Sequence, residues 1–133
     1  MGTNGSTPQV TCETSFFQIR PGEDAATNPG RYGEALAKWM QQQLQARSVD
    51  VEEVVAEDFG WALILSRKPF LLWLACGNVD GSKTEWSLFP VAEPPMICRR
   101  FGRKRIREAT HALWHQVNAI VPDIPGVTNI CWE

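Results

Sequence analysis

The side chains whose spacing best suits metal binding are Glu108, His111 and His115. On an α-helix, residues three and four apart share one face, so these three would converge as ligands. Their order is not that of an HExxH zinc motif, Arg107 adds a positive charge beside them, and no second cluster supplies further ligands. We therefore interpret the histidines as partly exposed helix residues, leave a metal site open as a hypothesis, and predict no cofactor.

Paired carboxylates at 23–24, 52–53 and 57–58 are the next candidates for chemistry. Two carboxylates perform acid and base catalysis only when unlike surroundings separate their pKa values, and adjacent residues in turns seldom have unlike surroundings. No Ser-His-Asp or Cys-His order and no glycine-rich phosphate loop accompanies them. We predict no catalytic residue, and interpret the pairs either as solvated turns or as an acidic rim for a basic partner.

A basic cluster occupies 99–107, where six of the 13 lysines and arginines of the chain fall within nine residues. Such a density can neutralise phosphates or an acidic protein surface. The whole chain nevertheless has a formal net charge of −2 and no recognised nucleic-acid motif, so nucleic-acid binding through this segment ranks third among the functions considered.

Two glycine-containing stretches, 28–33 and 57–61, have residue types that are more constrained than an ordinary loop requires. Glycine is costly inside a helix, so the glycines of Asn28-Pro29-Gly30-Arg31-Tyr32-Gly33 indicate that either a crossing strand or a partner approaches this backbone closely. In Glu57-Asp58-Phe59-Gly60-Trp61 an acidic turn leads into two large rings, which form either a corner of the core, the preferred interpretation, or an exposed aromatic anchor.

Together with Pro21-Gly22-Glu23-Asp24 and Cys76-Gly77-Asn78, these stretches resemble the characteristic motifs of a group of small uncharacterised bacterial proteins of about this length. The resemblance extends from Cys12 to about Val91 and implies no particular reaction. In size and layout the chain also resembles the immunity proteins that neutralise toxins, which is an analogy of architecture.

The elements that must position these residues follow from hydrophobic periodicity. The first strand is expected at 10–19, in an interior position because both of its faces carry apolar groups. A helix is expected from an Asn28 cap and Pro29 to about Arg47. Its apolar face is predicted to carry Tyr32, Leu36, Trp39, Met40 and Leu44. Four strand-like runs at 51–56, 61–66, 70–76 and 85–91 have the spacing of an antiparallel meander. The run 70–76 is apolar almost throughout, as expected of a central strand covered on both faces. A second amphipathic helix is expected at about 103–120, and 127–132 suits a short final strand. The inner face of this second helix is predicted to carry Ile106, Thr110, Leu113, Val117 and Val121.

The predicted fold class is therefore α+β: a mainly antiparallel sheet of five or six strands in the order β-α-β-β-β-β-α, with both helices packed on it. A composition of 44% hydrophobic and 21% charged residues suits one globular domain, expected at 10–133 after a polar, flexible leader at 1–9. The four cysteines form no CxxC pair and are expected to be free. Without a signal-like start or a membrane-length apolar run, we predict a cytoplasmic protein with no membrane contact.

These observations favour a non-catalytic module that binds another protein, such as a toxin or effector, as an immunity-type inhibitor. The second hypothesis is an enzyme or small-ligand site near the first helix start, using Asn28, Arg31, Tyr32, Glu57 and Asp58. The expected partner-binding residues are Glu23, Asp24, Arg31, Glu57, Asp58, Trp61, Arg103, Lys104 and Arg105.

Overall fold

A computed structural model describes residues 7–93 and 99–133, with only the backbone of 99–101 considered. The strands are β1 (Val10–Glu13), β2 (Glu53–Glu57), β3 (Gly60–Ser66), β4 (Leu71–Asn78), β5 (Glu85–Glu93) and β6 (Thr128–Trp132). The helices are α1 (Glu34–Ala46) and α2 (Arg99–Ile120), and short 3₁₀ turns lie at η1 (Glu23–Ala25) and η3 (Val121–Asp123).

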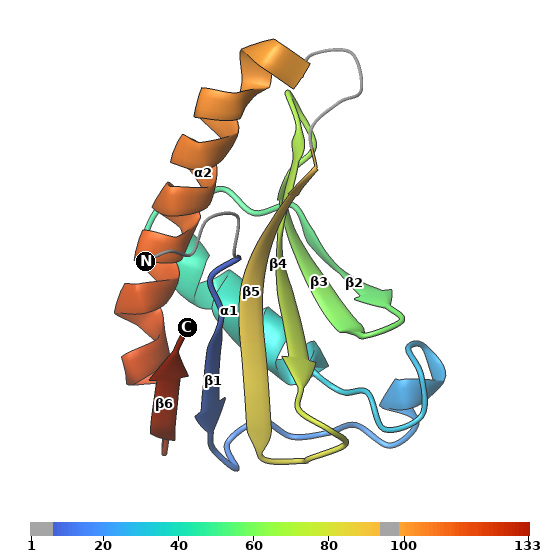
Figure 1. Ribbon diagram of the computed structural model, residues 1–133. Helices are drawn as coiled ribbons and strands as arrows, with labels where there is room; N and C mark the ends of the chain where they lie inside the picture. Colours follow the sequence, from blue (N-terminus) through green and yellow to red (C-terminus); the bar gives the residue numbers. More distant parts are fainter. Residues whose placement is uncertain (1–6, 94–98) are drawn as a thin grey trace.

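The six strands form one antiparallel sheet in the order β2-β3-β4-β5-β1-β6, which confirms the predicted α+β class (Figure 1). The apolar run of β4 lies inside the sheet, between β3 and β5, but helices pack on only one of its two faces. The first strand pairs with both β5 and β6, so its predicted interior position is also confirmed.

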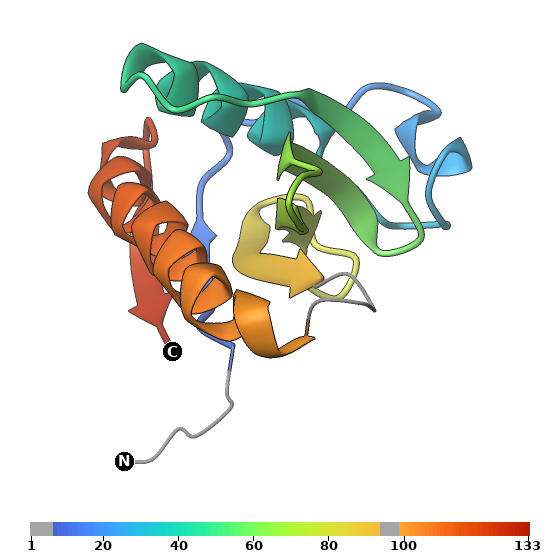
Figure 2. The same cartoon turned by 90° about the horizontal axis from the view of Figure 1, so that it is seen from above.

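Both helices pack on the same face of the sheet, and the hydrophobic core lies between them and the strands (Figures 1 and 2). In α1 the periodic residues Leu36, Met40 and Leu44 are fully buried, and in α2 Leu113 and Val117 are buried in the same core. The predicted apolar stripes therefore face the sheet. Within the described residues, no helix is long and apolar enough to span a membrane.

The predicted start of the first helix is wrong. The helix begins at Glu34 rather than at Pro29, because Gly30 and Gly33 have φ values of 79° and 148°, which are not helical. Asn28 does not cap the helix. The Glu23 carboxylate instead accepts hydrogen bonds from the backbone N–H groups of Gly33 and Glu34, at 2.9 and 3.0 Å.

Three other boundaries also differ from prediction. The first strand ends at Glu13 rather than at residue 19, and the second helix begins at Arg99 rather than near 103. The ordered domain includes Gln9, which exchanges two backbone hydrogen bonds with Glu133, so the leader predicted at 1–9 is too long. Its residues 1–6 lie outside the described part of the chain.

Three cysteines in the described residues are free, as predicted: Cys12 and Cys76 are buried and Cys131 is exposed, while Cys98 is outside the described residues. Burial, with a smaller effect of Glu13, raises the pKa of Cys12 to about 11, and burial raises the pKa of Cys76 as well. Thiolates are the reactive form of cysteine, so both buried thiols are disfavoured as nucleophiles.

In a Cys98→Ser variant at pH 8, we therefore expect one thiol, Cys131, to react rapidly with Ellman's reagent. The other two should react about 100-fold more slowly, because their thiolate fraction is small and their access is blocked. Denaturation in urea should make all three equivalent, which is the control. Two rapidly reacting thiols in the native protein would contradict the burial of Cys12 or Cys76.

Candidate protein-binding surface

The acidic and glycine-containing stretches converge at one corner of the molecule, where the loop at 20–33 meets the β2–β3 turn. The Asn28 side-chain amide donates a hydrogen bond to the carbonyl oxygen of Asp58 at 2.9 Å. The backbone N–H of Gly30 donates to the carboxylate of Asp24, also at 2.9 Å. Residues that are 30 positions apart in the chain are thus held side by side.

Close backbone contacts explain why glycine occurs at this corner. A Cβ atom on Gly33 would lie 2.6 Å from the carbonyl oxygen of Cys76, and one on Gly60 would lie 2.8 Å from the same atom. A Cβ atom on Gly77 would lie 3.3 Å from the carbonyl oxygen of Phe59. The predicted close approach is confirmed, and the approaching segment is β4. These glycines therefore have a structural role.

Asn78, which the sequence analysis did not single out as a site residue, joins the same segments. Its side-chain oxygen accepts the backbone N–H of Tyr32 at 3.0 Å, and its amide donates to the carbonyls of Gly30 and Ser82 at 2.9 and 2.8 Å. The one sequence signal is a polar amide at the end of an apolar strand. The corner is consequently rigid, because side chains satisfy its backbone groups.

Two residues predicted to bind a partner are buried instead. Glu23 is 1% exposed, and besides its two bonds to the α1 start its carboxylate accepts the N–H of Arg20 at 3.3 Å. Trp61 is 6% exposed, and its indole nitrogen is buried with no hydrogen-bond partner among the described residues. Neither side chain can contact a partner in this conformation. Trp61 therefore lies at a corner of the hydrophobic core, which was the preferred interpretation of the stretch 57–61.

The exposed part of the corner consists of Arg31, Glu57 and Asp58, with Asp24 half-buried beside them. A hollow of about 430 Å³ near the first helix start is lined by Asp24 and Tyr32, but not by Asn28, Arg31, Glu57 or Asp58. The set of residues predicted for a ligand pocket is therefore not assembled there.

The face of the sheet opposite the helices carries all the acidic residues of the strands. Successive residues of a strand point to opposite faces, and the residues next to each of these glutamates pack toward the core. In the described chain, no strand contains a lysine or arginine. The glutamates of this open face are Glu13, Glu53, Glu57, Glu85 and Glu93.

Half-buried apolar side chains occupy the centre of the open face. The rings of Phe59 and Trp73 stack at 5.7 Å between centroids, and the Trp73 indole donates to Glu93 at 3.1 Å. On the same face of the sheet, Ala62 and Ala75 are each only 1% exposed. Figure 1 shows no helix in front of this part of the sheet. The apolar side chains are Val55, Phe59, Leu71, Trp73, Phe89 and Val91.

Comparison of the chain with protein-family models, with curated proteins and with solved structures yields no match. The geometry of the surface is therefore the basis for a functional proposal.

The basic residues of the second predicted surface lie on a different element. Arg103, Lys104 and Arg105 are all exposed on α2, which packs on the core side of the sheet. The salt bridges found among the described side chains involve Arg20, Lys38 and Arg67 rather than these three. Positive charge on α2 and negative charge on the open face are thus separated in space.

The metal hypothesis gains no support from the structure. Glu108, His111 and His115 are exposed on α2. Among the residues that the structure describes, no group of three histidine, cysteine, aspartate or glutamate side chains lies close enough to hold a metal ion.

Proposed function

We propose that this chain is a non-catalytic module of the immunity type, which binds and neutralises another protein through the open face of its sheet. The proposed partner is basic: it presents an apolar element surrounded by lysines and arginines. The observation that carries this proposal is the arrangement of half-buried rings inside a border of glutamates. That arrangement matches the apolar centre and polar rim of protein interfaces.

The size of the open face suits such an interface. Strands in a sheet are about 4.8 Å apart and rise about 3.3 Å per residue, so the part formed by β2 to β5 covers roughly 500 Å². The adjacent corner with Arg31 and Asp58, and the strands β1 and β6, enlarge it toward the roughly 800 Å² per partner of a standard protein complex. A broad sheet surface of this kind fits a protein better than a small molecule, which needs a concave pocket.

A pair of like charges supports a role in binding rather than in stability. Glu13 lies directly opposite Glu85 in the β1–β5 ladder. Like charges in that position repel and destabilise a sheet by a fraction of a kcal/mol. A cationic group of a partner would remove the repulsion, so binding would recover the energy that the isolated fold loses.

Charge reversal tests the proposal. The wild-type protein would be used as bait in lysate of the native host, and the captured partner purified for titration calorimetry. The triple variant Glu53→Lys, Glu57→Lys, Glu93→Lys should weaken binding about 30-fold or more, because like charges across an interface cost several kcal/mol. Inhibition of the partner's activity should decline in parallel.

The matched control is Asp50→Lys, Glu108→Lys, Asp123→Lys, which changes the net charge equally at exposed positions outside the strands. It should bind within about threefold of wild type, since long-range charge alone is screened by salt. Equal weakening by both triple variants, or a captured partner with an acidic binding surface, would refute a role for the open face.

A further inference from the structure

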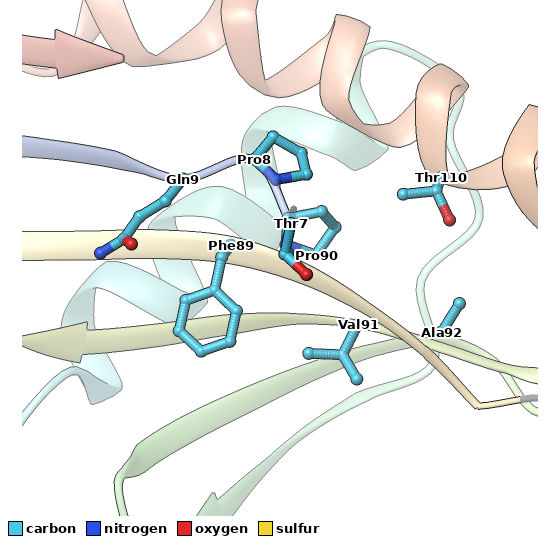
Figure 3. A pocket seen from close by; sticks show the side chains of 8 residues that line it. All are labelled: Thr7, Pro8, Gln9, Phe89, Pro90, Val91, Ala92 and Thr110. Atoms are coloured by element: carbon cyan, nitrogen blue, oxygen red, sulfur yellow. The ribbon is translucent and has the colours of Figure 1, made fainter. Parts of the chain in front are cut away.

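A groove runs between α2 and the last residues of β5, and its lining continues along α2. One part has a volume of about 520 Å³ and lies between Pro90, Ala92 and Thr110, as Figure 3 shows. A second part of about 650 Å³ lies along α2. Both parts are lined by Pro8 and Thr110, so they are adjacent.

The first part of the groove borders a free edge of β5. The β1–β5 ladder begins with Val10 opposite Leu88, so continuing it would place Pro8 opposite Pro90. Proline has no backbone N–H, and prolines on both strands stop the ladder at this point. The residues of β5 from 89 to 93 therefore have a strand partner on the β4 side alone, within the described chain.

The direction of the free backbone groups follows from the ladder. The carbonyl oxygen of Glu85 accepts a hydrogen bond from the N–H of Val79, on the β4 side of the strand. The carbonyl oxygen of Thr84 accepts one from the N–H of Thr14, on the β1 side. Backbone groups alternate along an antiparallel strand, so even-numbered residues of β5 point toward the β1 side. Pro90 thus directs a carbonyl into the groove, and Ala92 directs both an N–H and a carbonyl.

The second part of the groove supplies positive charge and an aromatic wall. Lys104 and Arg107 line it and are exposed, whereas Glu108 is the only carboxylate in its lining. The Trp114 ring packs edge-to-face against Trp132, with centroids 6.0 Å apart, and forms the apolar side. Free sheet-edge groups beside a basic helix are the features that a strand-like ligand with acidic side chains requires.

We infer that this groove binds an extended, acidic peptide segment by strand addition to β5. Backbone hydrogen bonds to Pro90 and Ala92 would hold its main chain. Its carboxylates would contact Lys104 and Arg107, and an apolar side chain would pack against Trp114. A peptide fits better than a nucleic acid, because nucleic acid has no groups that continue a sheet ladder. The groove has the opposite charge to the open face and lies between β5 and α2. This inference rests on backbone groups of β5 and side chains of α2, which the proposed function does not use.

The inference is tested by titrating the ¹⁵N-labelled full chain with a short peptide of alternating valine and glutamate at up to millimolar concentration. The backbone resonance of Ala92 and the indole resonance of Trp114 should shift together. The double variant Lys104→Glu, Arg107→Glu should weaken binding about 10-fold or more, since like-charge contacts replace two attractive ones. The double variant Lys38→Glu, Lys83→Glu, with exposed lysines elsewhere, should bind as wild type.

Two comparison ligands distinguish the alternatives. A peptide of alternating valine and lysine should bind at least about 10-fold more weakly, and oligo-deoxythymidine should not shift the Ala92 resonance. The inference is overturned if the lysine peptide binds equally well, if the oligonucleotide binds more tightly than the acidic peptide, or if Ala92 does not respond.

Discussion

Replacing Gly33 with alanine is expected to lower the free energy of unfolding by about 2–6 kcal/mol. Two effects add at this residue. Its φ of 148° is a conformation that residues with a Cβ atom rarely adopt, and strain of this kind costs about 1–3 kcal/mol. In addition, the new Cβ would lie 2.6 Å from the carbonyl oxygen of Cys76. That oxygen belongs to the interior strand β4, which has little freedom to move, so overpacking adds about 1–3 kcal/mol.

The matched control is Gly81→Ala. Gly81 also has a positive φ, 75°, but in the described part of the chain no atom beyond its immediate neighbours lies within 4 Å of the position where its Cβ would be. This variant should lose only about 1–2 kcal/mol, the cost of a left-handed conformation alone. Urea denaturation of both variants, followed by circular dichroism, measures the difference. Equal losses would show that the close contact between Gly33 and Cys76 does not constrain the fold.

Replacing Glu23 with alanine is expected to cost about 3–4 kcal/mol of stability. The variant would leave the backbone N–H groups of Arg20, Gly33 and Glu34 without their acceptor, in a place where the Glu23 side chain is 1% exposed. An unsatisfied buried donor costs about 1–3 kcal/mol. The carboxylate also lies at the positive end of the α1 dipole, and that favourable interaction would be lost.

Glu23→Gln separates these two contributions. The amide keeps the shape of the side chain and one acceptor oxygen but has no charge, so about half of the loss is expected. Glu57→Ala, at an exposed position, should change stability by less than about 0.5 kcal/mol. If Glu23→Ala were as stable as Glu57→Ala, the carboxylate would not organise the loop at 20–33, and the start of α1 would need another explanation.

Much of the fold could be predicted from the sequence, because hydrophobic periodicity is a local property of the chain. The spacing of Leu36, Met40 and Leu44 identified the buried face of α1, and the apolar run of β4 identified an interior strand. The spacing of turn residues predicted the antiparallel meander. Boundaries were less predictable. Asn28-Pro29 has the local form of a helix start, but a hydrogen bond from Asn28 to Asp58, far along the chain, holds it in the loop.

The candidate surface was predictable only in part. The sequence shows which residues are acidic or aromatic, but it did not show that Glu23 and Trp61 are buried. Burial depends on the segments that pack over a side chain, and local sequence does not specify those segments. The alternation of Glu53, Val55 and Glu57 is a local signal that places the two glutamates on one face of β2.

What the sequence alone determined was the class of each element and its apolar stripe, since both depend on neighbouring residues. Only the tertiary structure decided that five glutamates from three strands share one face and that half-buried rings lie between them. Strand order and register bring β1, β2 and β5 into one sheet, and they arise from contacts between residues as far apart as Glu13 and Glu85. Hydrophobic burial decides which face the helices cover: both pack on the face that carries the buried apolar side chains, and among the described residues no helix covers the acidic face.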